Sequence, residues 1–169
     1  MVTTAAVLPD PAVVAGAVPD PELPVLTLAD LGVLAGVERA DGGAVTVWLT
    51  PTYSGCPAVA EMAADVATRL EAAGFPDVRV RLRLDPPWSS DQITPAGRAK
   101  LAAAGIAPPG PAAAGPTPVR LGPTRLAAVA CPQCGSTETE ELSRFGSTAC
   151  KALWRCRSCR EPFEHLKEI

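Results

Sequence analysis

The sequence has few of the side chains on which hydrolytic and acid–base catalysis depend. Among its 169 residues His165 is the only histidine, and aromatic residues make up 4%. No Ser/His/Asp set, phosphate-binding glycine loop or two-carboxylate hydrolase signature stands out. General acid–base chemistry therefore has few candidate groups. We predict no catalytic residues, and an accessory protein in place of an enzyme.

An excess of positive charge and a long hydrophobic run are also missing. The net charge is −3, so no basic field exists for nucleic acid or an anionic membrane. The longest uncharged window, 101–119, holds five prolines and three glycines and does not suit a membrane helix. Residues 1–19 contain no Lys or Arg, unlike a secretory signal. We expect a cytoplasmic protein without nucleic-acid or membrane partners, whose six cysteines are metal ligands or thiols.

The first part of the chain has the pattern of a small α+β domain. Three runs have the character of β-strands, namely 33–40, 44–50 and 78–84. A glycine-rich hairpin turn joins the first two, and a helix with one apolar stripe is predicted over 57–73. In the third run apolar residues alternate with Arg79, Arg81 and Arg83. After a tail of residues 1–9, we predict over 10–105 a small three-stranded sheet with helices on one face. The arginines form a solvated face or, alternatively, meet an anionic partner.

Cys56 lies where the second predicted strand passes into the predicted helix, in Thr50-Pro51-Thr52-Tyr53-Ser54-Gly55-Cys56-Pro57. Proline is favoured at the first position of a helix, because its missing N–H would have no partner there anyway. The Cys56 thiol would then lie beside unpaired backbone N–H groups and the positive end of the helix dipole. Such a place lowers the pKa of a thiol and favours the thiolate, which binds metal. The alternative is a small buried apolar residue, and the sequence leaves both open.

Two acidic residues, Asp20 and Glu22, lie in a segment with three prolines, 18–24, which forbids a helix. They are cap and turn groups in the simpler interpretation. They are alternatively oxygen ligands of a metal, or a base beside a thiol. Nothing local in the sequence decides between these.

The C-terminal residues 128–169 form a second predicted domain, after a linker at 106–127 rich in proline, alanine and glycine. Its two Cys-x-x-Cys pairs supply four thiolates: Cys131, Cys134, Cys156 and Cys159. This spacing is typical of a tetrahedral structural zinc site, so we predict a zinc ribbon, with iron as the alternative ion. Its six acidic and six basic residues cancel, which argues against a nucleic-acid ribbon. His165 is expected to be a packing or surface residue and not a ligand.

Cys150 lies outside both pairs, in Phe145-Gly-Ser-Thr-Ala-Cys150-Lys151. It is either a small buried residue of the ribbon or a second working thiol, helped by the neighbouring Lys151. The sequence does not choose between these.

Taken together, these motifs resemble known families. Asp20-Pro21-Glu22, followed by Thr50 and Gly55-Cys56-Pro57, resembles the small α/β family of iron–sulfur assembly factors. Joined to the two Cys-x-x-Cys pairs and the Cys150 segment, the pattern resembles the D-subunit family of the phenylacetyl-CoA epoxidase system. The resemblance implies an accessory role in aerobic phenylacetate degradation, in which the protein builds or repairs metal centres of its partners. Those partners are the subunits of the phenylacetyl-CoA oxygenase/reductase complex, and a homodimer is a further candidate assembly.

Two main hypotheses follow for the function. In the first, the chain is a maturation factor: Cys56 holds iron or a labile cluster, Asp20 or Glu22 adds a ligand or takes a proton, and the ribbon docks the client. In the second, the chain is a non-catalytic structural subunit of the oxygenase, and Cys56 is inert. A third, a redox protein that pairs Cys56 with Cys150, lacks a Cys-x-x-Cys near the helix of the first domain.

Overall fold

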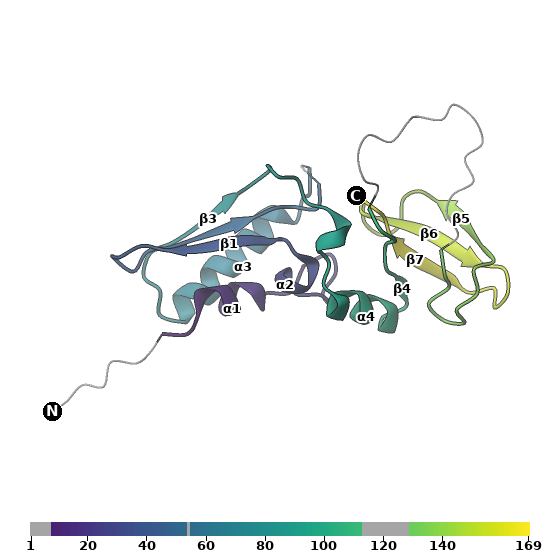
Figure 1. The fold of residues 1–169 in the computed structure, drawn as a ribbon, viewed down its shortest axis with the longest axis horizontal. Helices are drawn as coiled ribbons and strands as arrows, with labels where there is room; N and C mark the ends of the chain where they lie inside the picture. The colour runs from purple at the N-terminus through teal and green to yellow at the C-terminus, as the bar shows by residue number, and fades with distance from the viewer. Residues whose placement is uncertain (1–7, 54, 113–128) are drawn as a thin grey trace. The chain divides into compact units, whose positions relative to one another are not determined.

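The computed structural model describes residues 8–53, 55–112 and 129–169 (Figure 1). The chain divides into two compact units, Met1–Trp88 and Ser89–Ile169, and each is described here by itself. Most of the predicted tail, and residues 113–127 of the predicted linker, lie outside the described residues. Within the described residues, no helix has both the length and the apolar character needed to cross a bilayer.

The first unit contains the predicted three-stranded sheet, in the order β1-β2-β3. Its strands are β1 (Leu34–Arg39), β2 (Val45–Leu49) and β3 (Val78–Leu82). β1 and β2 are antiparallel and joined by the predicted hairpin, in which the Ala40 N–H donates to the Ala44 carbonyl at 2.9 Å. β3 runs parallel to β2, and such a pair needs a long crossover, which α3 (Val59–Ala72) provides.

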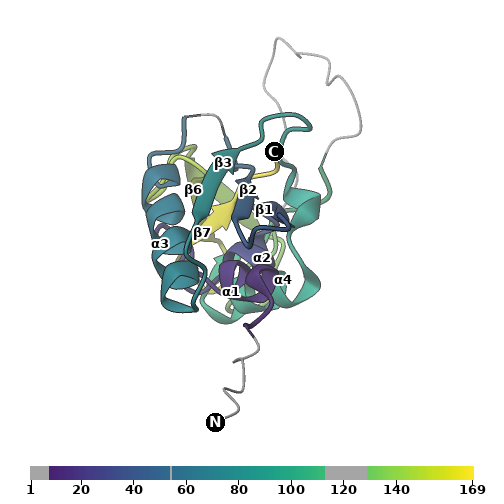
Figure 2. The same ribbon diagram turned by 90° about the vertical axis from the view of Figure 1, so that its left-hand side faces the viewer.

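Helices cover one face of this sheet (Figure 2). α3 packs against β3, and α1 (Pro11–Gly16) contacts both α3 and β1. α2 (Leu28–Leu31) begins with a capping box between Thr27 and Asp30. The apolar stripe of α3 (Met62, Val66, Leu70) and the alternate residues of β2 (Val45, Val47, Leu49) are all buried. The expected sheet with helices on one face is therefore confirmed.

The opposite face of the sheet carries the arginines. Trp48 of β2 lies there opposite Gly36 of β1 and Arg81 of β3. The guanidinium carbons of Arg81 and Arg83 lie 5.9 and 5.0 Å from the centre of the Trp48 ring, within the range of a cation–π contact. These arginines thus cover an aromatic ring as well as facing solvent.

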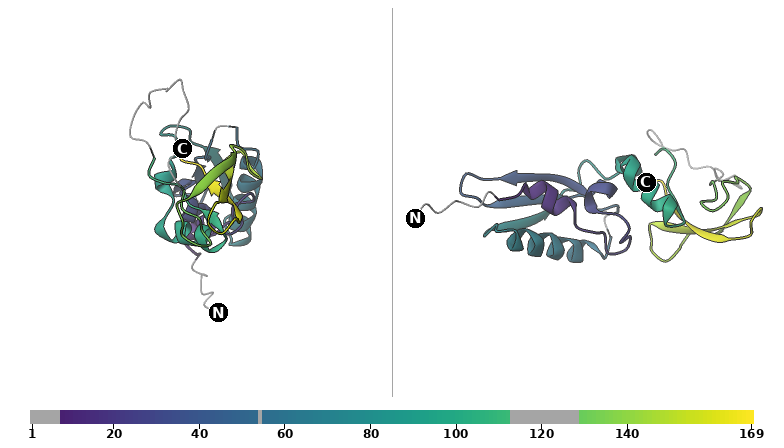
Figure 3. Two further views of the ribbon diagram at one scale, coloured as in Figure 1. Left: turned by 90° about the vertical axis from the view of Figure 1, so that its right-hand side faces the viewer. Right: turned by 90° about the horizontal axis from the view of Figure 1, so that it is seen from below.

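The second unit contains a four-stranded sheet in the order β4-β7-β6-β5. Its elements are a short 3-10 turn η1 (Ser90–Gln92), α4 (Pro95–Ala103), β4 (Ile106–Ala107), β5 (Thr139–Ser143), β6 (Lys151–Cys156) and β7 (Pro162–Leu166). In Figure 3 the strands β5 to β7 appear in green and yellow. A small apolar core fills the unit: Ala107, Cys131, Ala152, Trp154, Cys156 and Phe163.

The division between the units differs from the boundary expected at residue 105. Ile106 and Ala107, expected in the linker, form β4 and pair in parallel with Glu164 and His165 of β7. The Ser90 N–H donates to the Ile169 carbonyl at 3.0 Å, and Arg98 Nη2 donates to the Ser90 carbonyl at 2.8 Å. β4 therefore adds a short edge strand to the ribbon sheet. The hydrogen bond from Ser90 to Ile169 likewise joins the segment before α4 to the ribbon.

Candidate metal centre and the cysteine loop

The structure brings four cysteines from distant parts of the second unit together. The sulfur atoms of Cys131, Cys134, Cys156 and Cys159 all lie within 4.8 Å of one another. The Sγ atoms of Cys131 and Cys159 are 3.7 Å apart, and those of Cys134 and Cys156 are 3.6 Å apart. A tetrahedral zinc ion with Zn–S bonds of ~2.3 Å requires sulfur atoms separated by about 3.8 Å. The donor set therefore fits one four-coordinate ion.

Two similar turns present these thiols. In the first, the Gly135 N–H donates to the Cys131 carbonyl at 2.8 Å, and Gly135 has a left-handed backbone (φ 74°). In the second, the Cys159 N–H points at the Cys156 sulfur at 3.5 Å, and Arg160 has the left-handed backbone (φ 68°). A glycine adopts this conformation without steric cost, whereas an arginine adopts it at a steric cost. The two turns thus share a left-handed residue directly after the second ligand, which is a glycine in one turn and an arginine in the other.

The thiols are also electrostatically suited to a cation. The backbone N–H of Cys159, as the main cause, lowers the pKa of Cys156 to about 6. The backbone N–H of Glu161 favours the Cys159 thiolate, but burial and the three neighbouring thiols together raise the pKa of Cys159 to about 12. Four thiolates at this spacing repel one another, so a cation at their centre is what allows all four to be ionised together.

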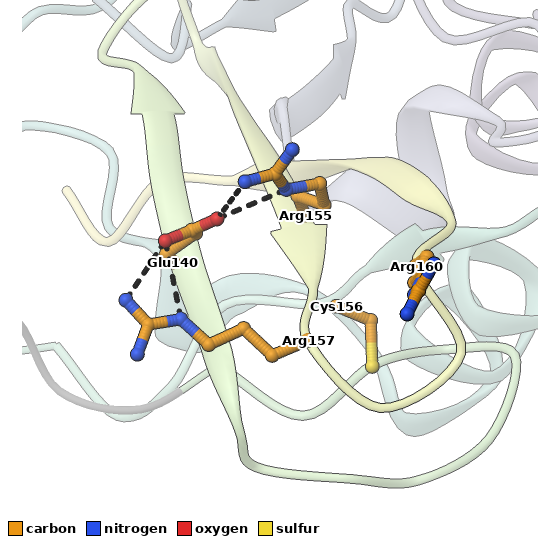
Figure 4. Close-up of a pocket in the computed structure, with 5 residues that line it drawn as sticks. All are labelled: Glu140, Arg155, Cys156, Arg157 and Arg160. Carbon is orange, nitrogen blue, oxygen red and sulfur yellow. Dashed lines mark hydrogen bonds and ion pairs between the residues drawn. The ribbon is translucent and has the colours of Figure 1, made fainter.

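A basic pocket of about 480 Å³ adjoins Cys156, lined by Glu140 and by three arginines, Arg155, Arg157 and Arg160. Figure 4 shows Glu140 between Arg155 and Arg157, with Arg160 on the other side of Cys156. The Nε atoms of Arg155 and Arg157 donate to the two different Glu140 carboxylate oxygens, at 2.9 and 3.1 Å. These two arginines, Arg155 first, lower the pKa of Glu140. Sequence reasoning missed this pocket, although arginines on either side of Cys156 indicate a shared face.

Cys56 is not placed as the sequence predicts. α3 begins at Val59 with Ala58 as its N-cap residue, so Pro57 is not its first residue. Residues 57 and 58 form a turn, in which the Val59 N–H donates to the Cys56 carbonyl at 3.4 Å. Pro57 favours this turn because its ring fixes φ at about −65°, the value that the second residue of such a turn requires. The prediction of Cys56 at the helix start is therefore wrong by two residues, and the thiol, half-buried, lies in the loop before the helix.

Asp20 has the turn role that was one of its predicted alternatives. Its Oδ1 accepts the backbone N–H groups of Glu22 and Leu23 at 2.9 and 2.7 Å, and its side chain is buried. Glu22 is half-buried in the same loop. Across the described residues, Asp20, Glu22 and Cys56 are not gathered into a cluster comparable to the four cysteines. Whether they act together on a metal therefore stays a prediction.

Cys150 and His165 are both buried, at 4% exposure each. The Cys150 sulfur lies 3.1 Å from the Thr148 hydroxyl, and its neighbour Lys151 pairs with Glu164 at 2.8 Å. His165 packs edge-on against Trp154, with ring centres 5.9 Å apart. Among the described residues neither belongs to the four-cysteine group. His165 therefore has the packing position that the sequence predicts.

Comparison with known proteins gives a family match for each unit. Residues 16–82 match the model described as "Iron-sulfur cluster assembly protein", and residues 115–167 match the "PaaD zinc beta ribbon domain". The chain is thus similar to iron–sulfur assembly proteins over its first unit, and to a named zinc ribbon over the part that holds the four cysteines.

Individual proteins are similar over different lengths of the chain. The D subunit of the "Putative 1,2-phenylacetyl-CoA epoxidase" of Escherichia coli (strain K12) is 46% identical over 152 residues, covering 90% of this chain and 87% of that protein. An "Fe-S protein maturation auxiliary factor" of Porphyromonas gingivalis (strain ATCC BAA-308 / W83) is 36% identical over 44% of this chain and 71% of its own. A solved domain of unknown function, DUF59, from Bacillus anthracis is 24% identical with a TM-score of 0.49, covering 54% of this chain and 87% of that domain.

Proposed function

This chain belongs to the D-subunit family of phenylacetyl-CoA epoxidase, and from that premise we propose that it matures or repairs the iron or iron–sulfur centre of the phenylacetyl-CoA oxygenase/epoxidase complex. In this proposal the chain is a non-catalytic accessory protein. Its iron or cluster is cargo, carried briefly for a client subunit. The assembly-protein match over residues 16–82 supports the proposal, because it spans Asp20, Glu22 and Cys56.

The observation that carries the proposal is a contrast between the four ribbon cysteines, which form a complete set of metal ligands, and Cys56, which lies outside that set. The four ribbon cysteines already supply a full set of ligands for one tetrahedral ion. Closed four-ligand sites are structural, while sites that exchange a ligand keep a position open. We assign zinc to the ribbon, since the match to a zinc ribbon and the four thiolates both favour it. Transfer then falls to Cys56, a half-buried thiol on a loop.

The two carboxylates would assist Cys56 in different ways. Asp20 is already engaged by two backbone N–H groups, so its contribution is to hold the shape of the loop. Glu22 extends from that loop as a half-buried side chain and is the better oxygen ligand or proton acceptor. A carboxylate adds a hard ligand to a site whose main donor is a soft thiolate.

A structural-subunit role is the second candidate, favoured by the word "subunit" in the name of the Escherichia coli relative. Both functions require contact with the oxygenase, but they differ in when that contact is needed. A maturation factor is needed while the client is made and not afterwards. A structural subunit is needed at every turnover. The redox alternative has less support, because burial of Cys150 at 4% exposure keeps its sulfur from exchange partners.

The deciding experiment measures client iron and client activity separately. The oxygenase and reductase subunits are purified from cells that contain the Cys56→Ala protein, and their iron is compared with that from wild-type cells. Cys150→Ala is the matched control, because it removes a buried thiol. We expect iron-poor subunits with Cys56→Ala alone, and turnover by fully loaded oxygenase without this chain. Normal client iron, together with a need for the chain during turnover, would establish the structural role instead.

A further inference from the structure

The two ligand-bearing turns of the ribbon differ at one position, and the difference is unfavourable for folding. Gly135 and Arg160 both follow the second cysteine of a pair, and both have a left-handed backbone, with φ of 74° and 68°. A non-glycine residue adopts this conformation at a steric cost, because its Cβ atom lies too close to the backbone. An arginine is therefore unfavourable for the turn itself, which suggests that the side chain of Arg160 has a function of its own.

The side chain of Arg160 belongs to the basic pocket beside Cys156 (Figure 4). With Arg155, Arg157 and Glu140, the pocket contains three positive charges and one negative. Arg155 and Arg157 are themselves 52% and 65% exposed, so they can be reached from solvent. A volume of about 480 Å³ is within the range of ligand sites, ~300–1,000 Å³.

The pocket already shows which group it binds. Arg155 donates from both Nε and Nη2 to Oε1 of Glu140, and Arg157 donates from Nε and Nη2 to Oε2. Planar guanidinium groups recognise carboxylates through such paired hydrogen bonds. Glu140 therefore occupies the site as an internal carboxylate, while Arg160 extends the positive surface beyond it.

We propose that this arginine pocket is a docking site for the carboxylates of an acidic segment on a protein partner. Arg160 supplies the additional positive charge, and Glu140 is the internal group with which the partner competes. That the partner is an oxygenase client rests on the proposed function. Nucleic acid is a poorer occupant, because the residues from Cys131 onward carry as many acidic as basic groups and the whole chain is negative.

A purely structural role for the arginines makes a different prediction. Four thiolates around a divalent ion leave a net negative charge, which nearby arginines would offset. In that case, loss of Arg160 should weaken metal binding. In the docking proposal, replacement of Arg160 by glycine relaxes the turn and leaves the metal in place, but removes a contact with the acidic segment.

The test is fluorescence anisotropy with the full-length, metal-loaded chain and a labelled twelve-residue peptide of alternating glutamate and glycine. Arg160→Gly should weaken the peptide about tenfold, the size of one lost charge-assisted contact, with unchanged metal content and an unchanged or higher melting temperature. Arg79→Ala is the matched control: Arg79 has the same charge as Arg160, is likewise exposed and pairs with Asp77, yet lies outside the pocket. Glu140→Gln should tighten the peptide, because it removes the internal competitor.

Three outcomes would overturn the proposal: equal peptide affinity in Arg160→Gly and Arg79→Ala, loss of metal in Arg160→Gly, or equal binding of a glutamine-for-glutamate peptide. Inorganic pyrophosphate that outcompetes the peptide at equal charge would overturn it too, because a phosphate site is then the better description. The measurement does not involve Cys56. A negative peptide-binding result would therefore not contradict the maturation role. Normal client iron in Cys56→Ala cells would likewise not contradict the docking site.

Discussion

The two units of this chain place their cysteines in opposite ways. In the second unit four thiols meet within 4.8 Å, and two of them, Cys131 and Cys156, are buried in the small core. In the first unit Cys56 lies half-buried in a loop of a domain that has its own apolar core. The comparison teaches that the ribbon thiols are distinguished by their complete set of ligands and not by burial, because Cys134 and Cys159 are exposed. In the proposed function Cys56 carries iron or a cluster, and such a thiol must stay accessible to the client subunit.

The largest difference between the ribbon thiols and Cys56 is expected in the stability of the variant Cys131→Ser. The variant should release about one ion per chain and unfold the second unit, because apparent binding free energies of structural zinc reach about 10–16 kcal/mol. Since β4 pairs with β7, the loss of order should extend back toward Ser89, while the first unit stays folded. Metal analysis and hydrogen exchange measure both effects. Cys150→Ser is the control, and full metal content in Cys131→Ser would refute the four-thiolate site.

The next effect concerns the buried ion pair of the second unit. Lys151 is 6% exposed and its Nζ lies 2.8 Å from Glu164, which also accepts the Ser147 N–H at 2.7 Å. Lys151→Met leaves this partly buried carboxylate without its cation. We expect the free energy of unfolding to fall by about 1–3 kcal/mol, measured by denaturant titration with metal bound. The double variant Lys151→Met/Glu164→Gln should recover part of the loss; no recovery would mean that Lys151 acts by packing alone.

Stability of the second unit should fall in acid in two stages. Burial lowers the pKa of His165 below its usual 6.5, against the opposing charge of Glu168. The unfolded state then binds more protons, so stability is lost as the pH falls below about 6.5. Burial opposes ionisation of Glu164, yet Lys151 and Ser147 lower its pKa below 4.5, so a second loss follows below about 4.5. His165→Gln should remove only the loss of stability that begins near pH 6.5. Circular dichroism measures unfolding as the pH falls, while the metal content is monitored in the same samples.

The sequence predicts most of the architecture, because its signals are local. Strand-like runs joined by a hairpin turn, and clear alternation in the third run, identify the three strands of the first sheet. The two Cys-x-x-Cys pairs identify the four thiols that the fold brings together. What it misses depends on distant contacts. β4 is two residues long and exists only because β7 lies beside it. The arginine pocket requires Glu140 of β5 to lie opposite Arg155 of β6, a register that spacing alone does not give.

The start of α3 shows a different limit. Proline before an apolar stripe predicts a helix beginning at residue 57, yet the chain makes one more turn before Val59. Proline at the first helical position and proline in a turn have the same backbone φ near −65°. The sequence therefore locates this joint to within a turn, and the exact place of the Cys56 thiol comes from the fold.

The smallest expected effect on folding is that of Cys56→Ala. A small effect would show that Cys56, unlike the ribbon cysteines, does not hold its unit together. Because Cys56 lies in a loop and is half-buried, the substitution should change the free energy of unfolding by no more than about 0.5 kcal/mol, with ribbon metal unchanged. In the native protein the Cys56 thiol should nevertheless react with iodoacetamide much faster than Cys150, since Cys150 is only 4% exposed. Mass spectrometry of the partly alkylated chain measures both rates in one sample. Equal rates, or a large loss of stability in Cys56→Ala, would make Cys56 a structural residue like the ribbon thiols and remove the open thiol that the maturation role requires.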